Sequence, residues 1–129
     1  MVTGSCICNT IEFEVAGDDF EVVQCHCSKC RRITGSTADA MIVVPRNTLT
    51  WIKGLESIST YKSENGGGRS FCGNCGGPLP NEDGDVYWVP AGILNGDYKA
   101  TVKAHIYVGS KLPWEEIGGS APQYEENVT

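Results

Sequence analysis

Short apolar segments separated by turn residues recur along this chain, and one of them alternates with polar residues at the two-residue period of a β-strand. This segment is residues 11–15, where Ile11, Phe13 and Val15 alternate with two glutamates. This alternation predicts a strand with one face buried and the other in water. Shorter apolar segments also predict strands at residues 20–24, 38–44, 49–52, 58–61, 86–89 and 101–108.

Helical periodicity is almost absent from the sequence. One short helical turn is expected within residues 28–35, ending at Gly35, because glycine readily adopts the conformation that closes a helix. A second short turn is expected at residues 114–117, after Pro113. No repeat and no domain boundary is visible, so the sequence predicts a single all-β domain over residues 1–129. The glycine-rich residues 63–68 are expected to form a loop.

The amino-acid composition limits the classes of molecule that this protein is expected to bind. The 129 residues carry a net charge of −6 with a pI of about 4.8, which argues against binding to nucleic acids or anionic membranes. No apolar run approaches the ~20 residues of a membrane span, and residues 1–10 show no secretory signal. We therefore expect a reducing, cytoplasmic setting, in which clustered cysteines serve as metal ligands more often than as disulfides.

The seven cysteines are the main candidates for metal ligands in this sequence. Cys25, Cys27 and Cys30 fall within six residues, and the others form the pairs Cys6/Cys8 and Cys72/Cys75. A disulfide framework is the alternative, but seven is odd and a spacing of two residues is awkward for bridging within a pair. Three thiolates on one zinc would leave a fourth tetrahedral position open, as in reactive rather than purely structural sites.

The spacing alone does not settle which pair joins Cys72 and Cys75. If Cys25 and Cys27 joined them, Cys30 would be separated from a ready three-ligand cluster. We therefore favour a closed structural site of Cys6, Cys8, Cys72 and Cys75, and a second, catalytic zinc at Cys25, Cys27 and Cys30. Up to two zinc ions per chain are expected, and the closed site would contribute on the order of 10 kcal/mol to folding.

Other polar residues surround the three-cysteine stretch. Lys29, Arg31 and Arg32 are expected to offset the negative charge of the thiolates, and are candidates for binding a substrate carboxylate. His26 lies between two candidate ligands, but in an extended segment its side chain points away from them. We expect His26 to support the site without ligating the metal, and His105 to be a structural residue of its strand.

Together these motifs resemble those of a known family. GSCIC at 4–8, CHCSKCRRITGS at 25–36 and RSFCGNCG at 69–76 resemble the glutathione-dependent formaldehyde-activating enzymes, a group that includes S-(hydroxymethyl)glutathione synthase and relatives of centromere protein V. Further matching segments are VP at 44–45, PAG at 90–92, HIYV at 105–108, KLPW at 111–114 and PQYE at 122–125. The resemblance implies a β-tent of short antiparallel sheets cross-linked by zinc. It also implies a structural zinc at the four cysteines and a labile zinc at the three.

The function expected from these observations is that of a zinc-dependent carbon–sulfur lyase or synthase acting on a thiol adduct. The resemblance implies condensation of glutathione with formaldehyde to S-(hydroxymethyl)glutathione, so the expected partners are a small thiol and a small aldehyde. One alternative is a non-catalytic, zinc-stabilised β module that binds a protein partner. Another is a scavenger of thiols or formaldehyde that does not turn over.

Overall fold

The structure is a computed structural model that describes residues 1–64 and 68–127. The centre of the expected glycine-rich loop, residues 65–67, lies outside the described residues. The strands are β1 (Val2–Ser5), β2 (Glu12–Val15), β3 (Asp19–Cys25), β4 (Asp39–Pro45), β5 (Leu49–Lys53), β6 (Ile58–Lys62), β7 (Gly68–Cys72), β8 (Pro78–Leu79), β9 (Asn81–Asp83), β10 (Val86–Pro90) and β11 (Lys99–Ile106). The helices are α1 (Ser28–Thr34) and the 3-10 turns η1 (Arg46–Thr48), η2 (Leu55–Ser57), η3 (Ala91–Ile93) and η4 (Val108–Ser110).

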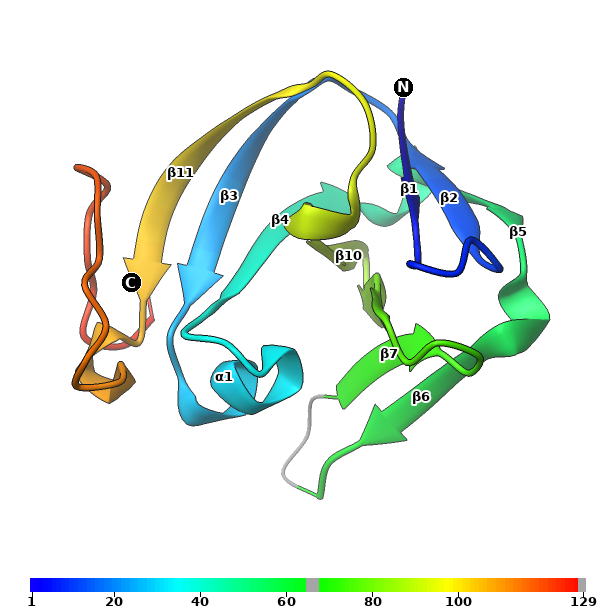
Figure 1. Ribbon diagram of the computed structural model, residues 1–129. Helices are drawn as coiled ribbons and strands as arrows, with labels where there is room; N and C mark the ends of the chain where they lie inside the picture. The colour runs from blue at the N-terminus through cyan, green and yellow to red at the C-terminus, as the bar shows by residue number, and fades with distance from the viewer. Residues whose placement is uncertain (65–67, 128–129) are drawn as a thin grey trace.

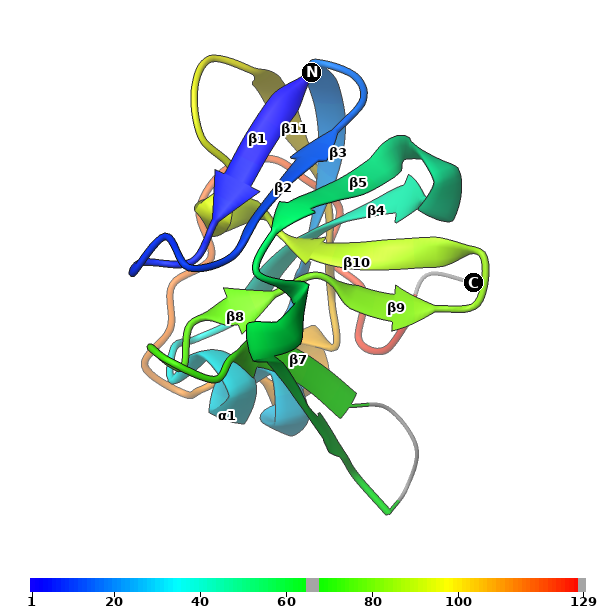
Figure 2. The ribbon, with the colours of Figure 1, turned by 90° about the vertical axis from the view of Figure 1, so that its right-hand side faces the viewer.

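These strands form three small sheets (Figures 1 and 2). Their orders are β1-β2-β5, β11-β3-β4-β10-β9 and β6-β7-β8. Figure 1 shows the β3–β11 pair on one side and the β6–β7 hairpin on the other, with α1 between their lower ends. The predicted all-β class is confirmed, and each predicted strand is found with its ends displaced by at most two residues.

The core lies between the first sheet and the five-stranded sheet. Phe13, Ile42 and Val89 are at most 1% exposed, and burying each side chain stabilises the fold by about 1.5–3 kcal/mol. Trp51 packs edge-on against Phe13, with ring centroids 5.7 Å apart. A Cβ at Gly4 would lie 2.2 Å from Phe13 Cζ, so β1 can lie this close to the core only with glycine there.

One strand pair departs from the antiparallel arrangement expected. β11 runs parallel to β3, with a bulge between Val102 and Ala104. The chain leaves β10, passes through η3 and returns to the start of β3, where Lys99 N–H donates to the Asp18 carbonyl at 2.7 Å. The two strands therefore begin at the same end. Short-range alternation gives no information on this pairing, because it depends on the path of the connection.

Of the two predicted helical turns, one is confirmed and the other is wrong. α1 is the helical turn predicted at residues 28–35, and Gly35 closes it with a φ of 64°. At residues 114–117 there is no helix, only a turn in which Glu115 N–H donates to the Leu112 carbonyl at 3.1 Å. The sequence does not predict strand β1, since glycine and serine dilute its alternation. Among the described residues, no helix is long and apolar enough to cross a membrane.

Candidate metal centres

Four cysteines from two distant segments meet at the junction of the first and third sheets. Cys6 and Cys8 lie in the loop between β1 and β2, Cys72 ends β7, and Cys75 lies in the turn before β8. Their four sulfur atoms all lie within 4.8 Å of one another. The Sγ atoms of Cys6 and Cys8 are 3.6 Å apart, and those of Cys8 and Cys72 are 3.8 Å apart.

The local backbone turns its donors toward these sulfurs. The N–H of Ile11 donates to Cys6 Sγ and the N–H of Asn74 donates to Cys72 Sγ, both at 3.4 Å. Hydrogen bonds with the Thr10 hydroxyl and the Asn74 side chain lower the pKa of the Cys8 thiol to about 5. A site that stabilises anionic sulfur in this way suits a metal ion, because thiolates rather than thiols are metal ligands.

The other three cysteines gather where β3 passes into α1. Cys25 is the last residue of β3, Cys27 caps α1, and Cys30 lies in the first turn of that helix. Their sulfurs also lie within 4.8 Å of one another, and Cys30 N–H donates to Cys27 Sγ at 3.4 Å. The short helix therefore brings Cys30 back to its two neighbours, so the three form one cluster.

Both clusters have the chemistry and spacing of a metal centre. Sulfurs bound at ~2.3 Å to one tetrahedral ion stand about 3.8 Å apart, close to the 3.6 and 3.8 Å separations in the four-cysteine cluster. The sulfurs of the three-cysteine cluster lie within 4.8 Å of one another. All seven cysteines are described and free, so the disulfide alternative is not supported. Four thiolates can complete the coordination of a tetrahedral ion, whereas three leave one position for another ligand. The donors are soft sulfur atoms, compatible with zinc.

Two thiols of the three-cysteine cluster have pKa values that are shifted in opposite directions. A hydrogen bond from Cys30 is the main cause that lowers the pKa of the Cys25 thiol to about 6, although burial opposes it. The same hydrogen bond and burial raise the pKa of Cys30. Asp39, which pairs with Cys25 across the β3–β4 register, is 8% exposed, and burial raises its pKa. No sequence motif identifies this carboxyl, because only strand pairing places it there.

The cations near α1 differ in their surroundings. Lys29 and Arg32 are exposed, whereas Arg31 is partly buried. Arg69 of β7 was not among the residues expected here. Its Nη1 donates to the Ile33 carbonyl at 2.9 Å, and its guanidinium lies 5.4 Å from the Phe71 ring centroid. Within the described residues, the buried Nε atoms of Arg31 and Arg69 have no hydrogen-bond partner.

His26 does not point into the three-cysteine cluster. Its ring is fully buried, with Nδ1 2.9 Å from Glu115 Oε1 and Nε2 3.0 Å from Nδ1 of His105. Both ring nitrogens are thus engaged by groups outside the cluster. This orientation agrees with the prediction that His26 does not ligate the metal, and the two contacts tie residues 25–27 to β11 and the C-terminal segment.

Comparisons with known proteins agree with this architecture. The chain is similar to a crystal structure of a Rhodobacter sphaeroides protein, with a TM-score of 0.58 and 24% identity over 77% of this chain and 99% of that one. This likeness shows a shared fold. A family model described as glutathione-dependent formaldehyde-activating enzyme matches residues 1–110, a range that contains all seven cysteines. The chain therefore belongs to the glutathione-dependent formaldehyde-activating enzyme family.

Proposed function

We propose that both clusters hold zinc and that the three-cysteine cluster is the active site of a carbon–sulfur lyase or synthase. The substrates would be a small thiol such as glutathione and a small aldehyde such as formaldehyde. The observation that carries the proposal is the contrast between the clusters: four sulfurs gather at one and three at the other. Three ligands would leave one coordination position for a substrate, and membership of the glutathione-dependent formaldehyde-activating enzyme family supports glutathione and formaldehyde as the substrates.

The reaction joins the two substrates without a redox step. The thiol sulfur forms a bond to the aldehyde carbon, the carbonyl π bond breaks, and the thiol proton ends on the new hydroxyl oxygen. With glutathione and formaldehyde the product is S-(hydroxymethyl)glutathione, and the reverse reaction is the lyase direction. Zinc bound by three thiolates would supply an open coordination position that lowers the pKa of an incoming thiol.

The chain's own residues would hold and orient the substrate. Cys25, Cys27 and Cys30 would fix the position of the ion at the end of β3. Arg31 and Arg69 carry buried guanidinium Nε atoms with no partner among the described residues, and these could donate to a glutathione carboxylate. Lys29 and Arg32, which are exposed, would contribute long-range attraction for an anionic substrate.

Exchange spectroscopy tests this proposal. ¹³C-labelled formaldehyde and glutathione interconvert with their adduct without catalysis, so the quantity to measure is the added exchange rate per zinc-loaded protein. Wild type should raise the rate, and Cys27→Ser should remove that increase while leaving the chain folded. Lys99→Ala, a change of an exposed residue outside both clusters, serves as control. If wild type adds nothing to the background rate, the alternative of a zinc-stabilised, partner-binding module gains support.

A further inference from the structure

One bulky residue of the chain has a left-handed backbone conformation. Tyr107 directly follows β11 and has a φ of 57° and a ψ of 36°. Among the described residues, the one other non-glycine residue with a positive φ is Asn9, and asparagine tolerates this conformation far better than a large aromatic residue does. Unfavourable conformations of this kind concentrate at functional sites, where the surrounding structure holds them in place.

Backbone hydrogen bonds hold Tyr107 on both sides. Its N–H donates to the Glu126 carbonyl at 2.9 Å, and its own carbonyl accepts from the N–H of Ser110 at 3.0 Å. The carbonyl of the preceding residue, Ile106, accepts from the N–H of His26 at 2.9 Å. The left-handed conformation therefore lies where the end of β11 meets the segment between β3 and α1.

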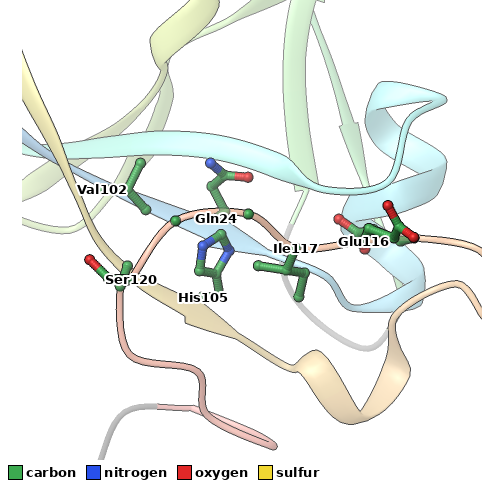
Figure 3. Close-up of a pocket in the computed structure, with 10 residues that line it drawn as sticks. Gln24, Val102, His105, Glu116, Ile117 and Ser120 are labelled. Carbon is green, nitrogen blue, oxygen red and sulfur yellow. The ribbon is translucent and has the colours of Figure 1, made fainter.

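This conformation changes the face on which the Tyr107 side chain lies. Side chains alternate along a strand, and His105 points into a cavity of about 270 Å³ between the β3–β11 pair and residues 115–121 (Figure 3). Continued alternation would place Tyr107 on the same face, but Tyr107 is not among the described residues that line the cavity. A φ of 57°, in place of the value of about −120° usual in parallel strands, rotates Cβ by nearly half a turn about the N–Cα bond.

The opposite face carries the three-cysteine cluster. Ile106 pairs with Cys25 in the parallel β3–β11 register. Tyr107 packs in the apolar cluster that contains both of these residues and that also includes Cys27 and Cys30. Tyr107 is only partly buried. A rigid aromatic side chain thus packs beside the cysteines and keeps a surface that a ligand can contact.

We propose that the Tyr107 ring forms a wall of the three-cysteine site and restricts the bulk of the thiol that binds there. The proposal rests on the function proposed above, in which three thiolates leave one position for an incoming sulfur. A fixed ring beside the site leaves room for a CH₂ group next to that sulfur but clashes with the methyl groups of a branched carbon. The preferred substrate class is therefore a primary thiol, such as glutathione.

Ligand titration of the full chain loaded with cobalt(II) tests this proposal without turnover. N-acetylcysteine and N-acetylpenicillamine carry the same carboxylate and amide, and differ by two methyl groups on the carbon that bears the sulfur. Wild type should bind N-acetylcysteine at least tenfold more tightly, as measured by the change in cobalt d–d absorbance. Equal affinities would overturn the proposed selectivity alone. No response to either thiol would refute the open position, and with it both this proposal and the proposed function.

Variants of Tyr107 separate the effect of the ring from that of the backbone. Tyr107→Gly removes the ring, and glycine adopts a positive φ without strain, so the fold should be kept. This variant should bind N-acetylpenicillamine at least tenfold more tightly than wild type does, with little change for N-acetylcysteine. Tyr107→Asn, which also tolerates the conformation, should behave in the same way.

Tyr107→Phe is the matched control, because it keeps the ring and loses only the hydroxyl group. It should discriminate between the two thiols as wild type does. A loss of discrimination in Tyr107→Phe, or its retention in Tyr107→Gly, would refute the role of the ring. Equal weakening of both thiols in Tyr107→Gly would show a purely structural role and would likewise overturn the proposal.

Discussion

Sγ of Cys8 lies 3.8 Å from Sγ of Cys72, although 64 positions separate the two residues along the chain. This proximity joins the loop after β1 to the end of β7, and so connects the first sheet to the third. Cys6 and Cys72 are buried, and pack with Ile11 and Leu79 in a small apolar cluster of their own. The four-cysteine cluster is thus part of the core that holds the sheets together, whereas the three-cysteine cluster lies at the end of a single sheet.

The two clusters should therefore respond differently to loss of a ligand. Cys75→Ser should lower the melting temperature by about 10 °C or more, because a structural metal contributes a large share of folding free energy in a domain of this size. Cys27→Ser should change the melting temperature by no more than a few degrees. Calorimetry of the two zinc-loaded variants checks this. Equal losses of stability would show that the clusters do not divide structural and reactive roles.

The contact between Glu115 and His26 supports a second prediction. Glu115→Ala should release the His26 ring and loosen the segment that carries Cys25 and Cys27, weakening metal binding at the three-cysteine cluster about tenfold. Glu115→Gln keeps an acceptor at the same place and should bind nearly as wild type does. Cadmium titration followed by thiolate charge-transfer absorbance measures the affinity directly. Equal affinities for the alanine variant and wild type would exclude this positioning role.

Arg69 should determine how glutathione is held. Arg69→Ala should raise the KM for glutathione about tenfold, since a charge-assisted hydrogen bond to a carboxylate is lost. The KM for cysteamine, a thiol without a carboxylate, should not change. Lys99→Ala, at an exposed position at the start of β11, is the control and should have little effect on either substrate. If Arg69→Ala weakens both thiols equally, the residue supports the fold of α1 and does not contact the substrate.

The pH dependence of stability should depend on His105. Burial, with a smaller contribution from His26, lowers its pKa below the ordinary value, against the opposing effect of Glu115. The folded chain therefore binds fewer protons at this position than the unfolded chain does below about pH 6.5, so the free energy of unfolding falls as the pH is lowered.

Replacing His105 should reduce the decrease in the free energy of unfolding that occurs as the pH is lowered. Urea unfolding of wild type and His105→Gln between pH 7 and pH 5 should show a shallower decrease in the variant. Both proteins share the cysteine clusters, so the difference between their slopes reports on His105. Parallel slopes would contradict the account given for its pKa.

The sequence predicted the positions of the strands better than it predicted how the strands pair. Alternation located strand β2, because burial of one face imposes a period of two, and short apolar segments located strands such as β5. It could not show that β11 lies parallel to β3, which depends on the path of the chain after β10. Residue spacing indicated the two cysteine clusters, since C-x-C and C-x-x-C are local patterns. The structure then brought the two distant pairs together, as predicted.

The neighbours of the sites were harder to anticipate. Asp39 lies opposite Cys25 through the β3–β4 register, and Arg69 reaches α1 from β7. Glu115 contacts His26 across 89 positions. No periodicity or motif encodes such contacts, because they arise from the packing of separate sheets. The prediction that His26 turns away from the cysteines succeeded for a local reason, the alternation of side chains in an extended segment.

Metal content tests most directly whether the four-cysteine cluster is a closed metal site and the three-cysteine cluster is a site with an open coordination position. Protein purified with zinc should contain two ions per chain by inductively coupled plasma mass spectrometry. A brief exposure to a chelator should remove one of them, and Cys27→Ser should contain only the ion that resists removal. A single tightly held zinc in wild type, or two ions retained by Cys27→Ser, would contradict the account.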